Sequence, residues 1–182
     1  MTLTTAAVLG TGAWGTTFAQ VLTDAGVTVT MWGRNADTIS FINGGENPTY
    51  LPGIALSDRI SATAEITEAV AGRELVVVAV PVKAVRATLS AAREAFAPGV
   101  ALLSLAKGLE LGSLKRVDEI IAEASGVPEN RIAVLSGPNL SREIAQRQPT
   151  ATVVAATDVE LAKEIAKACH NSYFRPYVST DV

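Results

Sequence analysis

Three glycines near the N-terminus have the spacing of a phosphate-binding turn. Gly10, Gly12 and Gly15 follow an apolar run at residues 6–9 and lead into residues 16–25, where apolar side chains recur at helical spacing. In a strand–turn–helix unit, the first glycine permits the tight turn, the second lets the backbone approach a pyrophosphate, and the third lets the helix pack closely on the sheet. Amides at the start of the helix then attract phosphate. Ordinary turns also contain glycines, but this context favours dinucleotide binding.

The second expected strand, residues 27–32, ends beside a cation. A unit that binds NAD would place Asp or Glu there to hold the ribose hydroxyls. This chain instead has Gly33-Arg34-Asn35, and Asp37 falls within the next helix. An arginine suits a 2′-phosphate, so NADPH is favoured over NADH, with NADH still an option. The alternative is that Arg34 is only a solvated cation after a strand.

Two later strand ends also carry polar groups. The expected strand at residues 100–105 runs directly into Lys107, and a lysine there points into the crevice where open α/β sheets bind ligands. Lys107 could orient a substrate oxygen, bind phosphate or contact the cofactor, or it could be an exposed loop lysine. The expected strand at residues 132–135 ends in a small-residue turn, residues 136–143, whose amides could hold an anion. Alternatively, Asn139 is the N-cap of the following helix.

Cys169 and His170 lie side by side near the end of an expected helix. A lone histidine next to a lone cysteine, without further ligands or an acidic partner, is typical of a structural position rather than a metal or catalytic site. A single cysteine also excludes an intrachain disulfide. The isolated Cys–His pair leads us to predict no metal site. The single cysteine leads us to predict the cytoplasm as the default compartment.

The hydrophobic pattern predicts the elements that must position these residues. Residues 75–80 are apolar and stop at Pro81, as in a central strand whose end should lie beside the glycine turn. Residues 44–53 are rich in turn formers and form either a connection or a lid beside the cofactor. Strands and helices that alternate in this way predict an α/β fold of the Rossmann type, a mostly parallel sheet with helices on both faces. The remaining expected strands are residues 60–62, 151–156 and 173–178, and the remaining expected helices are residues 64–71, 83–96, 113–124 and 158–168.

Composition bounds the class of protein. The chain has 182 residues, of which 48% are hydrophobic, and this fits one large domain or one domain with a fragment of another. The net charge is −3 and the basic residues are scattered, so we predict no nucleic-acid partner. No apolar run approaches the length of a membrane span, and the N-terminus lacks the basic region of a signal peptide.

Five stretches together resemble the bacterial NAD(P)-dependent glycerol-3-phosphate dehydrogenases, over essentially the whole chain. Several separate motifs in the right order are far more specific than one glycine pattern. The stretches are Gly10-Thr11-Gly12-Ala13-Trp14-Gly15, Trp32-Gly33-Arg34, Asn47-Pro48-Thr49-Tyr50-Leu51-Pro52-Gly53, Lys107-Gly108-Leu109-Glu110 and Ser136-Gly137-Pro138-Asn139.

The resemblance implies roles at the positions that match the family. Arg34 matches the basic residue at the adenosine end of the cofactor, and Lys107 matches a lysine shared by cofactor and glycerol phosphate. The family often has Thr at the position of Asn139 and Ala at that of Ser141. The implied cofactor-binding residues are Gly10, Gly12, Ala13, Trp14, Gly15, Arg34, Lys107 and Ser141. The implied substrate-binding residues are Lys107, Gly137 and Asn139.

The resemblance also implies a reaction, which is reversible hydride transfer between NAD(P)H and dihydroxyacetone phosphate, giving glycerol 3-phosphate for phospholipid synthesis. In the family an all-helical domain supplies the lysine that acts as general acid/base. We expect residues 1–182 to be the NAD(P)-binding domain alone, with that lysine beyond Val182, so that the fragment binds cofactor without turnover and can form a homodimer. The alternatives are another two-domain NADP-dependent hydroxy-acid or sugar-acid dehydrogenase, and a non-catalytic dinucleotide-binding module.

Overall fold

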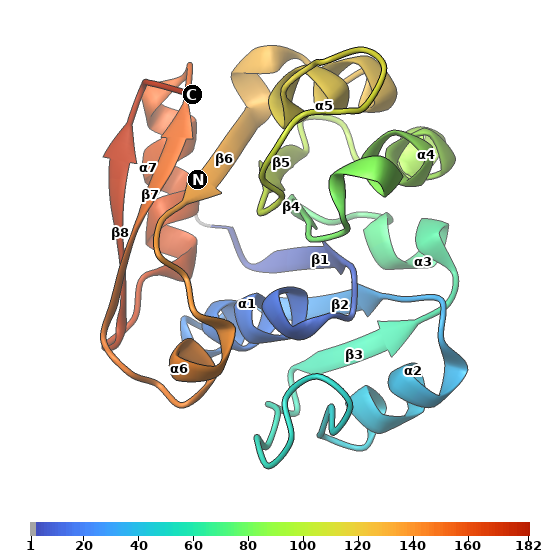
Figure 1. Cartoon of the computed structure of the whole chain (residues 1–182), viewed down its shortest axis with the longest axis vertical. Helices are drawn as coiled ribbons and strands as arrows, with labels where there is room; N and C mark the ends of the chain where they lie inside the picture. The colour runs from blue at the N-terminus through green and yellow to red at the C-terminus, as the bar shows by residue number, and fades with distance from the viewer. Residues whose placement is uncertain (1–2) are drawn as a thin grey trace.

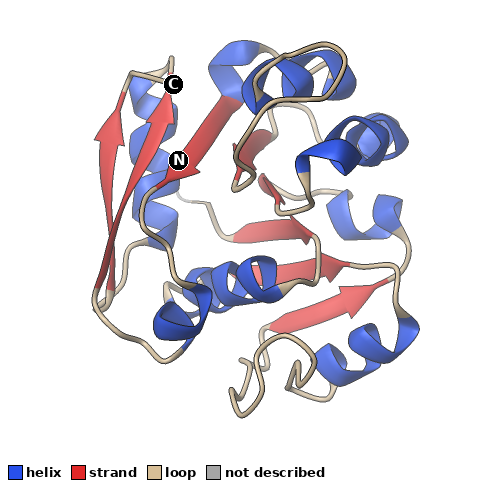
Figure 2. Cartoon of the chain, in the orientation of Figure 1, coloured by secondary structure: helices blue, strands red, loops and turns tan. Residues whose placement is uncertain are grey.

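The computed structural model describes residues 3–182 and contains one eight-stranded sheet (Figures 1 and 2). The strand order is β3-β2-β1-β4-β5-β6-β7-β8, and every neighbouring pair is parallel except β6 and β7. The predicted mostly parallel sheet is therefore confirmed. The strands are β1 Thr5–Leu9, β2 Thr28–Trp32, β3 Ile60–Thr63, β4 Leu75–Val78, β5 Ala101–Ser104, β6 Ile132–Ser136, β7 Thr150–Ala156 and β8 Phe174–Ser179.

Seven α-helices connect the described strands, and they lie on both faces of the sheet, as predicted (Figure 1). Short 3₁₀ turns at Arg93–Ala95 and Glu129–Arg131 extend two of the connections. Among residues 3–182, no helix combines the length and hydrophobicity needed to cross a bilayer. The helices are α1 Ala13–Asp24, α2 Ala36–Asn43, α3 Ile66–Val70, α4 Val82–Ala92, α5 Val117–Ser125, α6 Ser141–Ala145 and α7 Val159–Cys169.

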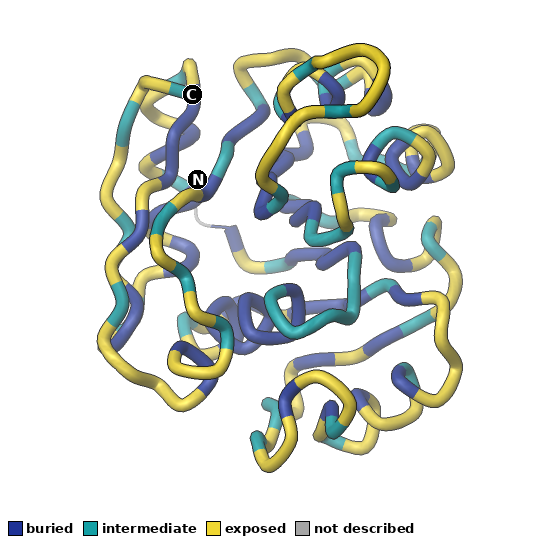
Figure 3. Tube along the Cα trace, in the orientation of Figure 1, coloured by how far each residue is buried: buried dark blue, intermediate teal, exposed yellow. Residues whose placement is uncertain are grey.

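The sheet separates two hydrophobic cores because alternate side chains of a strand point to opposite faces. On β1, Val8 packs in the same core as Phe18 of α1, whereas Leu9 packs with Leu89 of α4 and Ile120 of α5. All five side chains are fully buried. Figure 3 shows the buried trace running along the inner strands, with exposed segments in the outer loops. Strands covered on both faces explain the uniformly apolar residues of the central strands.

The helices α1 and α5 begin three and four residues away from their predicted starts, whereas α3 and α4 begin within two residues of theirs. α1 starts at Ala13 rather than Thr16, because Gly12 is its N-cap and Thr16 N–H already donates to the Gly12 carbonyl at 2.9 Å. The predicted start of the fifth helix at Ser113 is wrong. Leu114 has φ of 56°, a left-handed conformation that a right-handed helix does not accept, so α5 begins only at Val117.

Candidate functional site

The carboxyl ends of β1, β2, β4 and β5 meet around one open pocket of about 490 Å³. β1 lies at the centre of this group, paired with β2 on one side and β4 on the other. The expected contact between the end of β4 and the glycine turn is confirmed, because Ala79 N–H donates to the Leu9 carbonyl at 2.9 Å. The pocket is lined by Gly10, Thr11, Gly12, Trp32, Gly33, Arg34, Tyr50, Ala79, Val80, Pro81, Val82, Ala106 and Lys107.

Glycine is needed at the three positions of the turn for different physical reasons. Gly10 has φ of +126°, and a Cβ there would lie 2.8 Å from the Ala79 carbonyl oxygen. A Cβ on Gly15 would lie 2.3 Å from the Gly10 carbonyl oxygen. Gly12 differs, since a Cβ there would meet nothing within 4 Å. Gly10 and Gly15 therefore serve internal packing, whereas Gly12 leaves open space beside the backbone, as a closely approaching ligand needs.

The first turn of α1 offers backbone donors at this open space. Gly12 caps the helix without a side chain, and the first helical hydrogen bond comes from Thr16. The amides of Ala13, Trp14 and Gly15 therefore have no acceptor within the helix. Unpaired amides at the positive end of a helix dipole fit a pyrophosphate.

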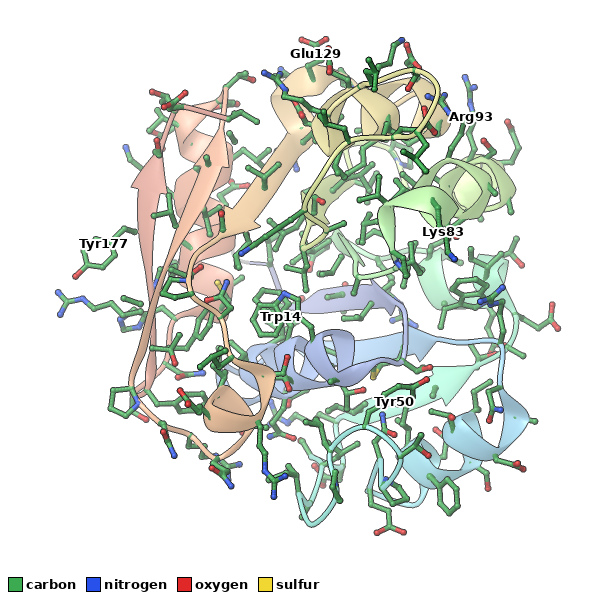
Figure 4. The ribbon with its side chains drawn as sticks, viewed as in Figure 1. Trp14, Tyr50, Lys83, Arg93, Glu129 and Tyr177 are labelled. Atoms are coloured by element: carbon green, nitrogen blue, oxygen red, sulfur yellow. The ribbon has the colours of Figure 1, made fainter. Side chains whose placement is uncertain are left out.

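Trp14 itself lies away from the lining of this pocket. The ring of Trp14, which is labelled in Figure 4, is half-buried. It packs edge-to-face on Phe18, with the centroids 5.7 Å apart. The tryptophan that lines the pocket is Trp32, whose Nε1 donates to the Ala64 carbonyl at 2.9 Å.

Arg34 stands at the end of β2 on the rim of the pocket. It is exposed, and within residues 3–182 its guanidinium has no ion pair or hydrogen bond. A Cβ on the preceding Gly33 would lie 2.6 Å from Thr11 Cγ2, so the chain passes close to the glycine turn here. Arg34 also lines a second hollow of about 280 Å³ that includes Ile66 of α3 and Ala84 of α4. This continuous surface has room for an extended ligand, with a free cation between its two parts.

Two expected substrate positions are brought into direct contact. Lys107 Nζ donates to the Gly137 carbonyl oxygen at 2.8 Å. The lysine side chain is exposed, so its other two N–H groups remain available. Lys107 follows β5 and Gly137 follows β6, which are parallel neighbours. The adjacent strand ends thus hold an ammonium group at the edge of the pocket.

The N-cap interpretation of Asn139 is wrong. Leu140 occupies the N-cap of α6, and Asn139 Nδ2 instead donates to Thr152 Oγ1 of β7 at 3.3 Å. Thr152 Oγ1 donates in turn to the Ser136 carbonyl at 3.0 Å, which anchors the turn to the antiparallel strand. Asn139 Oδ1 is buried and has no hydrogen-bond partner within residues 3–182.

Ser141, at the start of α6, contacts the first helix of the chain, α1. Thr17 Oγ1 of α1 donates to the Ser141 carbonyl at 3.2 Å across 124 residues of sequence. α6 therefore packs directly on α1, one turn beyond the glycine turn.

The sequence pattern missed several residues of the site. Tyr50, from the turn-rich segment, lines the pocket, and so does Pro81 after β4. Asn47 of the same segment is fully buried and bonded to the glycine turn. An aromatic residue between Pro48 and Pro52 was the available signal, because loops held on a rigid scaffold often carry binding residues.

Cys169 is buried at the end of α7, and burial raises the pKa of its thiol to about 12. Its Sγ donates to the Ile165 carbonyl at 3.2 Å, and His170 is the C-cap residue of the helix. These contacts support the structural role expected from the sequence. Within residues 3–182, no group of three or more His, Cys, Asp or Glu side chains could hold a metal ion.

Comparisons with known proteins agree with this geometry. Residues 5–162 match the family model described as NAD-dependent glycerol-3-phosphate dehydrogenase N-terminus. A relative from Thermobifida fusca, named glycerol-3-phosphate dehydrogenase with NAD(P)+, is 50% identical over 182 residues, which are 99% of this chain and 54% of the relative. A relative of the same name from Streptomyces griseus is 50% identical over 178 residues, 97% of this chain and 53% of the relative.

Solved structures show the same fold. The crystal structure of glycerol-3-phosphate dehydrogenase from Coxiella burnetii superposes with a TM-score of 0.91 at 28% identity, and covers 99% of this chain and 55% of that chain. A UDP-D-ManNAc dehydrogenase from Pyrococcus horikoshii superposes with a TM-score of 0.75 at 14% identity over 97% of this chain and 47% of that chain, a likeness of fold alone. The chain spans about half the length of the curated relatives it matches. With a family model that matches residues 5–162 and a glycine turn of the required geometry, the chain belongs to the NAD-dependent glycerol-3-phosphate dehydrogenase family, in its N-terminal region.

Proposed function

We propose that residues 1–182 form the dinucleotide-binding domain of an enzyme that transfers hydride reversibly between NAD(P)H and dihydroxyacetone phosphate, giving glycerol 3-phosphate. The observation that carries the proposal is the shared pocket, in which the glycine turn, Arg34 and Lys107 meet at the carboxyl ends of neighbouring strands. Ligands of open α/β sheets bind at this edge. The family membership supports the same assignment.

The proposed cofactor site runs from the glycine turn toward Arg34. The open space at Gly12 and the amides of Ala13, Trp14 and Gly15 suit the pyrophosphate. The unpaired Arg34 suits a 2′-phosphate, so NADPH is the preferred cofactor in this proposal.

The proposed substrate side comprises Lys107, Gly137 and Asn139. The bound nicotinamide supplies the hydride, and the protein supplies alignment and charge. Addition of hydride to a ketone leaves negative charge on its oxygen, which the Lys107 ammonium stabilises. The Gly137 carbonyl holds that ammonium in place, and the Asn139 Oδ1 is a buried acceptor close to the same turn. In the proposal Ser141, beside α1, is a further cofactor contact.

The proposal places the general acid/base lysine outside residues 1–182, in the half of the relatives' length that this chain does not span. Residues 1–182 alone are then expected to bind cofactor without turnover. We further propose a cytoplasmic protein that pairs as a homodimer. Exposed leucines near Lys107 support self-association, namely Leu109, Leu111 and Leu114.

Titration of the 182-residue chain with NADPH and then NADH tests the proposal. Trp32 lines the pocket and Trp14 lies in the first turn of α1, so tryptophan fluorescence reports on the site. Saturable quenching by NADPH, and weaker quenching by NADH, is the expected result. The absence of a response to either cofactor in a folded sample would contradict the proposal.

A further inference from the structure

A buried asparagine joins the loop after α2 to the glycine turn. Asn47 is 0% exposed, although Glu46 and Thr49 beside it are exposed. Asn47 Nδ2 donates to the Thr11 carbonyl at 3.0 Å and to Thr16 Oγ1 at 2.8 Å. Thr16 Oγ1 also donates to the Thr11 carbonyl, at 3.3 Å. Two side chains from different segments therefore hold one carbonyl of the turn.

The chemistry of these contacts requires an amide donor at position 47. A backbone carbonyl such as that of Thr11 can only accept, so the NH₂ group of Asn47 must face it. Asn47 Oδ1 is buried without a partner in residues 3–182, which costs free energy. Simple packing would favour an apolar side chain here, so the donor function accounts for the asparagine. An ionised aspartate would have the same shape but would place negative charge against the Thr11 carbonyl.

The main-chain carbonyl of Asn47 holds the turn that carries Tyr50, a residue of the pocket lining. This carbonyl accepts from Tyr50 N–H at 3.2 Å and from Leu51 N–H at 2.8 Å. Leu51 is buried at 2% exposure, and Tyr50 lines the pocket (Figure 4). One residue thus contacts the glycine turn through its side chain and positions Tyr50 through its backbone.

We infer that Asn47 is a positioning residue for dinucleotide binding, an inference that rests on the proposed function. The peptide unit between Thr11 and Gly12 is planar and trans, so its carbonyl and its N–H point in opposite directions. Asn47 is buried and holds the carbonyl on the interior side. The Gly12 N–H is thereby presented outward, to the pocket that Gly12 lines. Asn47 thus fixes the orientation of the Gly12 amide, directly before the Ala13, Trp14 and Gly15 amides proposed to bind the pyrophosphate, before any ligand arrives.

The test compares Asn47→Ala and Asn47→Asp with the wild-type 182-residue chain and with a matched control. Asn43 is that control, because it also bridges two segments with two hydrogen bonds. Its Nδ2 donates to the Ala62 carbonyl at 3.0 Å, and Ala62 N–H donates to its Oδ1 at 2.7 Å, outside the pocket lining. We measure the Kd for NADPH, the midpoint of urea unfolding, and the rate of amide hydrogen exchange.

Both Asn47 variants are expected to raise the Kd for NADPH by roughly tenfold or more. They should also speed exchange in residues 10–16 and 46–54 together. Asn43→Ala is expected to lower the unfolding midpoint while the Kd and the exchange of residues 10–16 stay at wild-type values. The inference would be overturned by wild-type exchange of residues 10–16 in both Asn47 variants, by unchanged NADPH binding, or by equal weakening in Asn43→Ala.

The experiment distinguishes failure of the proposed function from failure of the positioning role of Asn47. A folded wild-type chain that does not bind NADPH would contradict the proposed function. Hydrogen exchange, which needs no ligand, would then support the positioning role if residues 10–16 respond to Asn47→Ala, and overturn it if they do not.

Discussion

The Nζ of Lys107 donates to the carbonyl oxygen of Gly137 across 2.8 Å, although the two residues are 30 positions apart. Each follows one of two parallel neighbours, β5 and β6. The acceptor is a backbone oxygen, so its position depends on the sheet rather than on a flexible side chain. The ammonium is therefore held at the strand ends while two of its N–H groups stay free for a ligand.

Loss of this cation should impair catalysis more than stability. In a form of the protein that reaches the full length of its relatives, Lys107→Ala is expected to lower kcat/KM for dihydroxyacetone phosphate by about 10²–10³-fold, because a charge-stabilising donor is removed. Steady-state kinetics measure the loss, and thermal unfolding should show a folded protein. A kcat/KM within about threefold of wild type would refute this role for Lys107.

Substitution by alanine should affect stability at Gly15 and cofactor binding at Gly12. A Cβ at Gly15 would lie 2.3 Å from the Gly10 carbonyl, so Gly15→Ala should lower the free energy of unfolding by about 1–3 kcal/mol. A Cβ at Gly12 meets nothing within 4 Å, so Gly12→Ala should leave that free energy near the wild-type value. It should instead raise the Kd for NADPH by roughly tenfold or more, because the methyl group occupies the space beside the phosphate. Urea unfolding and fluorescence titration separate the two effects, and tight NADPH binding by Gly12→Ala would count against the pyrophosphate position.

Arg34 should determine the preference between the two cofactors. Arg34→Ala is expected to raise the Kd for NADPH by roughly tenfold and to leave the Kd for NADH nearly unchanged, since only NADPH carries the 2′-phosphate. Arg59→Ala is the control, because Arg59 is an exposed arginine bonded to the Gly26 carbonyl, outside the pocket lining. An equal rise in the Kd for NADPH and for NADH in Arg34→Ala would disprove the role of Arg34 in choosing between the two cofactors.

The loop that carries Lys107 should add to the acid sensitivity of the fold. Arg86 donates from Nε to Glu110 Oε1 at 2.9 Å and from Nη2 to Oε2 at 2.7 Å, and this pairing lowers the pKa of Glu110 from 4.5 to about 2. A lowered pKa in the folded state contributes stability that is complete above pH 4.5 and is lost as the pH falls through 2. Glu110→Gln should therefore show a smaller loss of stability than wild type between pH 4.5 and pH 2. Urea unfolding at several pH values measures this loss. Glu94→Gln is the control, because within residues 3–182 the Glu94 carboxylate has no hydrogen bond or ion pair. The same fall in the free energy of unfolding with pH in wild type and in Glu110→Gln would contradict the prediction.

Cys169 should be unreactive while the protein is folded. Its burial raises the pKa of the thiol to about 12, and the thiolate is the reactive form. At pH 8 we expect negligible reaction with a disulfide reagent in buffer and complete reaction in concentrated urea. Rapid labelling of the folded chain would show that the end of α7 opens readily.

The sequence by itself determined the fold class and the position of the glycine turn, because both depend on local patterns. The apolar run of β4 and the glycines after β1 report burial and backbone geometry at their own positions. The same local reasoning predicted most strands to within a residue or two. The prediction was wrong where the backbone conformation of one residue interrupts a helical pattern of apolar side chains. Leu114 is the example, because its positive φ delays the start of α5.

Only the tertiary structure decided which polar groups meet. Asn139 looked like a helix cap from its neighbours, but β7 runs antiparallel beside β6 and brings Thr152 to its amide. Asn47 and Thr11 are 36 residues apart, and no periodicity of either segment indicates their hydrogen bond. Hydrophobic spacing encodes which face of an element is buried, whereas contacts between distant side chains depend on the order of the strands and the path of the loops between them.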